Sequence, residues 1–236
     1  MRRILLALVR KQVGNDFDMR HFTPSYLPWQ QRVCVVPNGD LFEKLKSGKA
    51  SIVTDHIHSF TENGLRLMSG VTLEADIVVV ATGLNLQMLG GMAVTVDGEQ
   101  RSLSHLMTYK GVLVQDLPNF ACVFGHANTP WTLKVDLAAR YLCRLLAYMD
   151  AHDHAVAVPR DEEQSTQDAS ILDVLSSGYV QRGSATLPRQ GSKYPWRVTQ
   201  HLGRDTAVLL HEPIPDRWLR FEDAIATVPP RESAAA

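Results

Sequence analysis

Two short segments have the residue types and spacing of a strand end that meets a ligand. In the first, four apolar residues at 77–80 lead directly into Ala81-Thr82-Gly83. Such a run predicts a fully buried strand of a parallel sheet, and α/β folds bind ligands at the carboxyl ends of these strands. Glycine at that point lets a ligand or a backbone approach closely. On spacing alone, a glycine that ends a strand without any ligand is the commoner case.

The second segment, GHANTPWT, combines a strand end with a helix start. An apolar strand predicted at 120–124 ends at Gly125, and Thr129-Pro130 has the pattern of an N-cap residue followed by proline at the first helical position. The first N–H groups of a helix lack partners and lie at the positive end of its dipole. This arrangement suits an anionic or electron-rich ligand. A purely structural role stays open here too.

The elements that must position these segments follow from hydrophobic periodicity and turn residues. Strands are predicted at 50–55, 77–80 and 120–124, and hairpins turn at Asn63-Gly64 and at Asp97-Gly98. Helices are predicted near the start of the chain and at 40–46, 129–149 and 167–177. The third helix has an apolar stripe formed by Val135, Ala138, Leu142, Leu145, Leu146 and Met149. Lys134 and Asp136 are expected on its exposed or hinge side. The fold class is therefore α/β.

Composition restricts the partners and the compartment. The chain has 236 residues, of which 45% are hydrophobic and 21% charged, with a net charge of -1. No overall field favours nucleic acid or an anionic membrane, and no stretch reaches transmembrane length. Cys34, Cys122 and Cys143 lie in apolar surroundings without a C-x-x-C pair, which indicates buried thiols in a reducing compartment. We expect a cytoplasmic protein without stable membrane insertion.

Several familiar catalytic motifs are missing from the sequence. No two glycines are separated by a single residue, so a G-x-G-x-x-G dinucleotide loop is excluded, and there is no P-loop, H-E-x-x-H or G-x-S-x-G. The pairs His56/His58 and His152/His154 lack carboxylate or cysteine partners at ligand spacing. We therefore expect no metal site and no self-contained nucleotide site.

Four blocks, in order, resemble the carboxyl-terminal half of a class B flavoprotein monooxygenase of the Baeyer–Villiger type. They are HFTPSYLPWQQRVCVVPNGDLF, LEADIVVVATGLNLQ, PNFACVFGHANTPWTLKVDL and LPRQGSKYPWRVTQ. The resemblance implies a partial two-dinucleotide-binding-domain flavoprotein fold. Residues 1–83 would end the NADPH-binding domain, and 84–160 would form the carboxyl-terminal part of the FAD-binding domain. Residues 161–236 would be an extension of helices and loops with a disordered tail.

The resemblance also assigns roles to both segments. Thr82 and Gly83 would lie against FAD, and the helix start would meet the pyrimidine edge of its isoalloxazine. The cofactor contacts implied in the second segment are Gly125, Asn128, Trp131 and Thr132. A packing role for Trp131 beside the flavin is an equal alternative, and His126 is expected to shape the pocket rather than to react.

The function implied is that of an FAD- and NADPH-dependent monooxygenase that passes one oxygen atom from O2 to a ketone or a thio-compound. The family's FAD-binding glycine loop, its fingerprint and its NADPH-binding glycine loop have no counterpart in this chain. A gene fragment, a mispredicted start or one half of a split enzyme would explain this. Two alternatives therefore stand beside the enzyme: a non-catalytic remnant or interaction module, and a half that is complemented by an amino-terminal half in trans.

Arg32 is the catalytic residue that the resemblance implies. Related enzymes place an arginine just before the short helix that begins here at Asp40, and its guanidinium stabilises negative charge during oxygen insertion. Gln31 replaces the lysine of many relatives, so contact with the NADPH phosphate is not expected.

We predict that Arg32→Ala, in a full-length context, still reduces flavin with NADPH but lowers substrate oxygenation by about 10²–10³-fold, the usual loss for one charge-stabilising donor. Stopped-flow flavin reduction and product formation are the two measurements. Undiminished oxygenation would rule out this role for Arg32.

Overall fold

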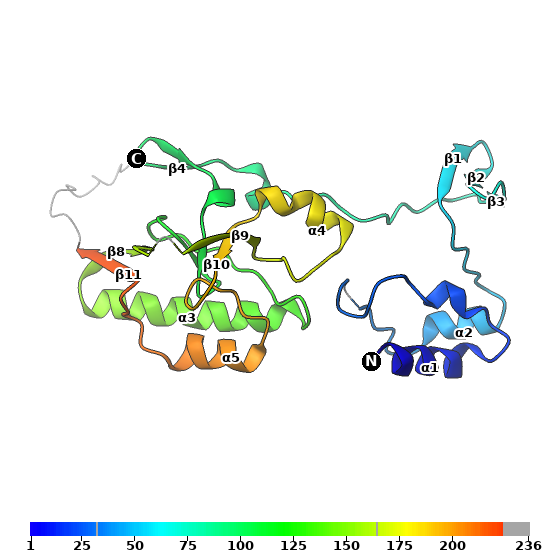
Figure 1. Cartoon of the computed structure of the whole chain (residues 1–236), viewed down its shortest axis with the longest axis horizontal. Helices are drawn as coiled ribbons and strands as arrows, with labels where there is room; N and C mark the ends of the chain where they lie inside the picture. Colours follow the sequence, from blue (N-terminus) through cyan, green and yellow to red (C-terminus); the bar gives the residue numbers. More distant parts are fainter. Residues whose placement is uncertain (32, 164, 224–236) are drawn as a thin grey trace, which may run out of the picture. The chain divides into compact units, whose positions relative to one another are not determined.

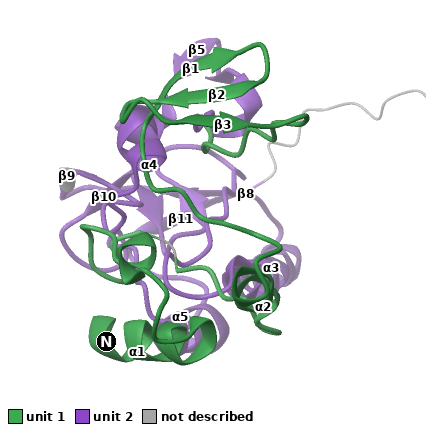
Figure 2. Cartoon of the chain, turned by 90° about the vertical axis from the view of Figure 1, so that its right-hand side faces the viewer, with its two compact units in different colours: residues 1–84 green, residues 85–236 purple. Residues whose placement is uncertain are grey.

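A computed structural model describes residues 1–31, 33–163 and 165–223, except for the side chains of 166–168. Arg32 and the tail at 228–236 lie outside the described residues. The chain divides into two compact units, Met1–Leu84 and Asn85–Ala236 (Figures 1 and 2). The assignment of either unit to a cofactor domain stays a prediction.

The first unit joins a small helical part to an antiparallel three-stranded sheet of order β1-β2-β3 (Figure 1). Its elements are α1 (Arg2–Val13), the 3-10 turn η1 (Met19–Phe22), α2 (Asp40–Lys46), β1 (Ile57–Thr61), β2 (Gly64–Leu67) and β3 (Thr72–Glu74). The predicted hairpin at Asn63-Gly64 is confirmed. Gly64 is required there, because a Cβ at its φ of 151° would lie 2.0 Å from the Leu73 carbonyl oxygen. The short helix at 40–46 is confirmed as well.

The apolar run at 77–80 does not form the buried strand that the sequence predicts. The backbone there pairs with no strand among the described residues, and Ile77, Val79 and Val80 are 83%, 82% and 68% exposed. A parallel strand needs hydrogen-bonding neighbours and covered faces. The sheet that precedes it, β1–β3, is antiparallel and ends at Glu74, so this unit supplies neither.

The second unit is built around one long helix. Its first elements are η2 (Met88–Gly91), β4 (Val94–Val96), β5 (Glu99–Arg101), η3 (Leu103–His105), β6 (Thr108–Tyr109), β7 (Leu113–Val114) and α3 (Trp131–Ala151). The remainder comprises β8 (His154–Pro159), β9 (Thr166–Ser170), α4 (Gly178–Gly183), η4 (Ser184–Thr186), β10 (Arg189–Gly191), α5 (Leu202–Thr206), the π-helical turn η5 (Ala207–His211) and β11 (Leu219–Asp223). All strand pairs are antiparallel: β4–β5, β6–β7, β9–β10 and β8–β11. The hairpin about Asp97-Gly98 is confirmed.

Helix α3 packs between the β8–β11 pair and the α5–η5 segment (Figure 1). Its buried face carries Leu137, Ala138, Tyr141, Leu145 and Met149. The predicted stripe is therefore right for Ala138, Leu145 and Met149 and wrong for Val135 and Leu146, which are exposed. Lys134 was also placed wrongly, because it is buried, whereas Asp136 is exposed as expected.

Four other sequence predictions fail locally. The region predicted as a helix at 167–177 contributes to strand β9, which pairs with β10, and the next helix, α4, begins only at Gly178. Residues 50–55 form no strand, and in 120–124 only Ala121 makes an isolated bridge, to Leu113. At 167–177, pairing with a strand that is distant in the sequence overrides helical propensity, which is a weak preference. Thr129 does not cap α3, which starts after Pro130 without a side-chain cap.

The cysteines are more accessible than the sequence suggested. Cys34 and Cys143 are exposed and Cys122 is half-buried, so the expectation of three buried thiols is wrong. Partial burial raises the pKa of the Cys122 thiol. No helix in the described part of the chain is long and apolar enough to cross a membrane.

A buried lysine joins the β6–β7 turn to the carboxyl-terminal segment. The Nζ atom of Lys110 lies 3.2 Å from Asp216 Oδ2 and 3.7 Å from Glu212 Oε2. The Tyr109 hydroxyl donates to Asp216 at 2.5 Å, and the Tyr194 hydroxyl donates to Glu212. The lysine also faces the rings of both tyrosines and of the Tyr141 side chain. Burial raises the pKa of all three tyrosines.

The two neighbouring leucines of α3 provide a direct test of this packing. Leu145 is 4% exposed and Leu146 is 58% exposed. Leu145→Ala should lower the free energy of unfolding by about 2–5 kcal/mol, because it leaves a cavity in the core. Leu146→Ala should change it by less than about 0.5 kcal/mol. Urea denaturation measures both, and equal losses would show that α3 packs through a different face.

Candidate functional site

The start of α3 is shaped by a close contact between Gly125 and Trp131. A Cβ added at Gly125 would lie 2.3 Å from Trp131 Cγ and 2.7 Å from Trp131 Cα. Only glycine fits there, because real Cβ atoms do not approach other heavy atoms so closely. The packing of Trp131 therefore explains why this buried residue is a glycine. The structural reading of Gly125 thus gains support, while a cofactor contact stays a prediction.

The loop before α3 is tied to a distant segment by Gln200. Its Oε1 atom accepts from the Ala127 N–H at 2.7 Å, and its backbone oxygen accepts from Asn128 Nδ2 at 3.0 Å. Ala127 is buried, whereas Asn128 is exposed. The loop backbone is therefore anchored, and the outer side of the helix start stays accessible to a ligand.

A buried polar cluster lies on the inner side of the same loop. The Asp205 carboxylate, 4% exposed, accepts from His126 Nε2 at 2.5 Å and from Lys134 Nζ at 2.8 Å. The Thr199 hydroxyl donates to its other oxygen. The second ring nitrogen of His126, Nδ1, lies 3.0 Å from the Thr129 hydroxyl. His126 and Lys134 are themselves buried.

The charges of this cluster largely cancel. Burial lowers the pKa of Lys134, and the Asp205 carboxylate partly opposes that shift. A buried carboxylate would be costly alone, but here it has an ammonium partner and two further donors. The electrostatic character of the helix start is then set by its own backbone, since the first turn of α3 contains no acidic residue.

The exposed groups at this helix start fit an electron-rich ligand edge. Asn128, Trp131 and Thr132 are exposed around it, and no side chain caps the first turn. The first N–H groups of a helix and the positive end of its dipole, here of a 21-residue helix, attract partial negative charge. The pyrimidine edge of a flavin has that character.

Thr82 and Gly83 belong to the first unit. Both are exposed, and Gly83 has a φ of 106° with no heavy atom within 4 Å of an added Cβ. This conformation favours glycine. In the second segment, Gly125 and Trp131 are in close contact, and Asn128 and Thr132 are exposed beside them in the sequence. The contact of all these residues, and of Thr82 and Gly83, with the cofactor stays a prediction.

Sequence reasoning missed Thr199, Gln200 and Asp205, which organise the second segment. Their positions in RVTQHLGRDTAVLL follow no motif; an acidic residue just before an apolar run was the available signal.

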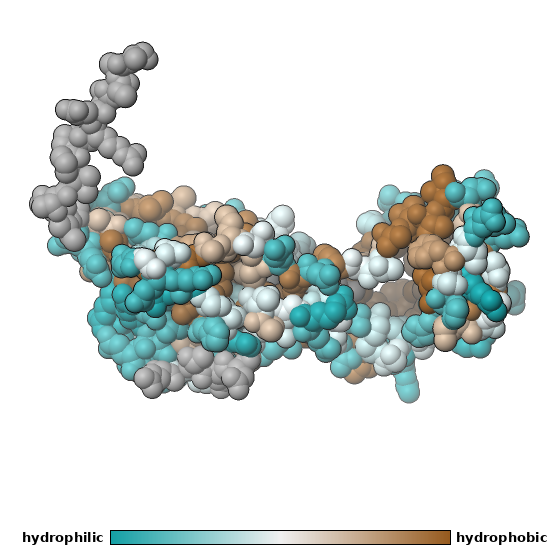
Figure 3. Space-filling model, turned by 90° about the horizontal axis from the view of Figure 1, so that it is seen from above, coloured by the Kyte–Doolittle hydropathy of each residue, from teal (hydrophilic) through white to brown (hydrophobic). Residues whose placement is uncertain are grey.

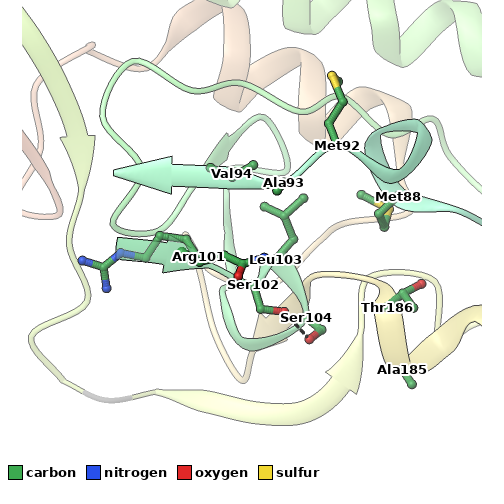
Figure 4. A pocket seen from close by; sticks show the side chains of 11 residues that line it. Met88, Met92, Ala93, Val94, Arg101, Ser102, Leu103, Ser104, Ala185 and Thr186 are labelled. Carbon is green, nitrogen blue, oxygen red and sulfur yellow. Dashed lines mark hydrogen bonds between the residues drawn. The ribbon is translucent and has the colours of Figure 1, made fainter. Parts of the chain in front are cut away.

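A pocket of about 510 Å³ elsewhere in this unit is lined by none of the predicted residues (Figure 4). Its walls combine Met88, Met92 and Leu103 with Ser102 and Ser104, whose hydroxyls lie 2.9 Å apart. Among the described residues, no group of three or more potential ligands could hold a metal ion.

Comparisons with known proteins point to flavoenzymes. The chain is 54% identical over 224 residues to MymA of Mycobacterium tuberculosis, named as an FAD-containing monooxygenase. It is 46% identical to AlmA of Acinetobacter baylyi, named as an FAD-binding monooxygenase, and 43% identical to the FAD-containing monooxygenase EthA of Mycobacterium tuberculosis. These matches cover 95–97% of this chain and 45–47% of the relatives.

The chain thus spans about half the length of the curated relatives it matches. No protein-family model and no solved structure matches it. Over nearly its whole length, the chain is homologous to one part of proteins that are named as FAD-containing or FAD-binding monooxygenases.

Proposed function

We propose that this chain forms one side of the flavin site of an FAD- and NADPH-dependent monooxygenase. The observation that carries the proposal is its 54% identity, over 95% of its length, to an FAD-containing monooxygenase. The fold class α/β agrees, and the finer assignment to the end of an NADPH domain and the second half of an FAD domain is part of the proposal. FAD reduced by NADPH would activate O2, and the acceptor would be a ketone or a thio-compound.

The chain's own contribution is to bind and orient the cofactor. The start of α3 presents Asn128, Trp131 and Thr132 on an accessible surface and keeps negative side chains out of the first turn. Negative charge that develops at a ligand edge there is stabilised without any rearrangement, since the helix N–H groups are already oriented. Thr82 and Gly83 would provide close backbone approach, and Gly125 would contribute by letting Trp131 pack at the edge of the site. Arg32 would stabilise charge during oxygen transfer.

The exposed apolar run at 77–80 supports the inference that additional polypeptide would cover it. All four of its side chains are apolar and at least 40% exposed. Figure 3 shows hydrophobic surface, in brown, on the first unit. A run that is apolar on both faces is typical of an interior strand in a parallel sheet. An amino-terminal half, covalently joined or bound in trans, would supply the neighbouring strands.

A non-catalytic interaction module is the alternative. The specific observation that favours it is the lack of any G-x-G-x-x-G segment in this chain, since FAD and NADPH both need such phosphate-binding loops. In that case the apolar run would still bind another chain, but no turnover would follow.

The decisive experiment joins this chain to the part of Mycobacterium tuberculosis MymA that it does not match. We predict that the joined protein binds stoichiometric FAD and oxidises NADPH in an O2- and substrate-dependent manner. The isolated chain should bind FAD poorly and oxidise no NADPH. Flavin absorbance and NADPH consumption measure this. A folded, colourless fusion would refute the enzymatic proposal, and a yellow, active isolated chain would refute the need for a second half.

Within the joined protein, Asn128→Asp tests the role of the helix start. An added carboxylate there repels an electron-rich ligand edge, and the change also removes the amide donor to the Gln200 oxygen. FAD affinity should therefore fall about threefold to tenfold, beyond any fall that a lower melting temperature explains. Gln181→Glu, the same kind of change on the exposed part of α4, is the matched control and should leave FAD affinity unchanged. Equal affinities in both variants would exclude a flavin edge at α3.

A further inference from the structure

The buried position of Asp205, and of the cluster of side chains around it, is not explained by cofactor contacts. Asp205 lies on α5, 79 residues from His126 and 71 residues from Lys134 in the sequence. Its carboxylate nevertheless contacts a residue on each side of the helix start, because His126 precedes α3 and Lys134 lies in its first turns. The two ends of the segment that is proposed to meet the flavin are therefore held by one carboxylate.

The two contacts serve different purposes. Lys134 neutralises the charge that burial would otherwise make costly. His126 links Asp205 to Thr129. With a proton on Nε2 it donates to Asp205, and its Nδ1 then accepts from the Thr129 hydroxyl at 3.0 Å. Thr129 is the residue before Pro130, after which α3 begins. The chain Asp205–His126–Thr129 thus fixes where the helix starts.

The local sequence cannot hold this geometry by itself. Helix α3 starts without a side-chain cap, and its first backbone bond, from the Leu133 N–H to the Pro130 oxygen, is 3.2 Å long. The loop depends instead on residues 199–205, through Asp205 and through the bond from the Ala127 N–H to Gln200. A helix end that lacks local capping needs such external partners to keep its orientation.

We propose that Asp205 is a positioning residue, which acts through His126 to hold the start of α3 in the orientation that binds the cofactor. The part of this inference that concerns cofactor binding rests on the proposed function. The fixed geometry of the segment is a separate claim that the chain alone can test. Asp205 touches neither substrate nor cofactor in this proposal.

The test separates the hydrogen bond from the charge pair. Asp205→Asn/Lys134→Met removes both charges but keeps an acceptor for His126. Asp205→Leu/Lys134→Met removes both charges and the acceptor. His126→Leu removes the same link and leaves the Lys134–Asp205 pair intact. Asp136→Asn, on the exposed side of α3, is the matched control.

Two readouts apply to each variant. The first is hydrogen exchange at the amides of Ala127 and Leu133 in this chain alone. The second is FAD affinity in the chain joined to the unmatched part of MymA, compared with the melting temperature of the same variant. Loss of one positioning hydrogen bond should accelerate exchange and weaken FAD binding by about tenfold in the leucine variants. The Asn/Met variant and the control should match the wild type in both.

Each outcome decides the proposal. Positioning through the hydrogen bond is supported if His126→Leu exchanges faster and binds FAD more weakly while the Asn/Met variant keeps the wild-type exchange rate and FAD affinity. Unchanged exchange in His126→Leu overturns it, even where the Leu/Met variant does not fold. FAD affinity that falls only in proportion to melting temperature, in every variant, also overturns it, because Asp205 would then be merely structural. A wild-type fusion that binds no FAD refutes the proposed function, while hydrogen exchange still tests the geometry.

Discussion

A buried carboxylate must be matched by donors, and the second unit is organised around that requirement at Asp205. The ammonium of Lys134, the imidazole of His126 and the hydroxyl of Thr199 meet it from three separate parts of the chain. Because Lys134 pairs with the buried charge and His126 and Thr199 add hydrogen bonds to the same carboxylate, α5, α3 and the loop before α3 are held in one arrangement. Asn128, Trp131 and Thr132 stay exposed at the helix start in this arrangement.

The first unit shows the opposite situation, in which apolar surface has no cover. Ile77, Val79 and Val80 are mostly exposed in unpaired backbone, although their sequence is that of an interior strand. A soluble protein gains free energy by covering such a run. In the proposed function, the amino-terminal half would provide that cover.

Local signals were readable from the sequence, and long-range ones were not. The hairpins at Asn63-Gly64 and Asp97-Gly98 and helix α2 were predicted, because turn and helix propensities act within a few residues. Residues 167–170 of β9 were predicted to be helical, because no local pattern indicates pairing with β10. Lys134 was placed at the surface because its partner, Asp205, is 71 residues away. The helix start at Gly125–Thr132 was recognisable, but the side chains that fix it were not.

The three tyrosines around Lys110 make the fold sensitive to alkali. Burial raises the pKa of Tyr109, Tyr141 and Tyr194, three of the six tyrosines in the chain, above the ordinary value of 10.0. Below that pH the folded and unfolded phenols hold the same protons, so their contribution to stability is intact. Above it the unfolded chain releases protons that the fold retains, and the free energy of unfolding falls. Tyrosinate absorbance from these three rings would then appear together with the loss of native structure.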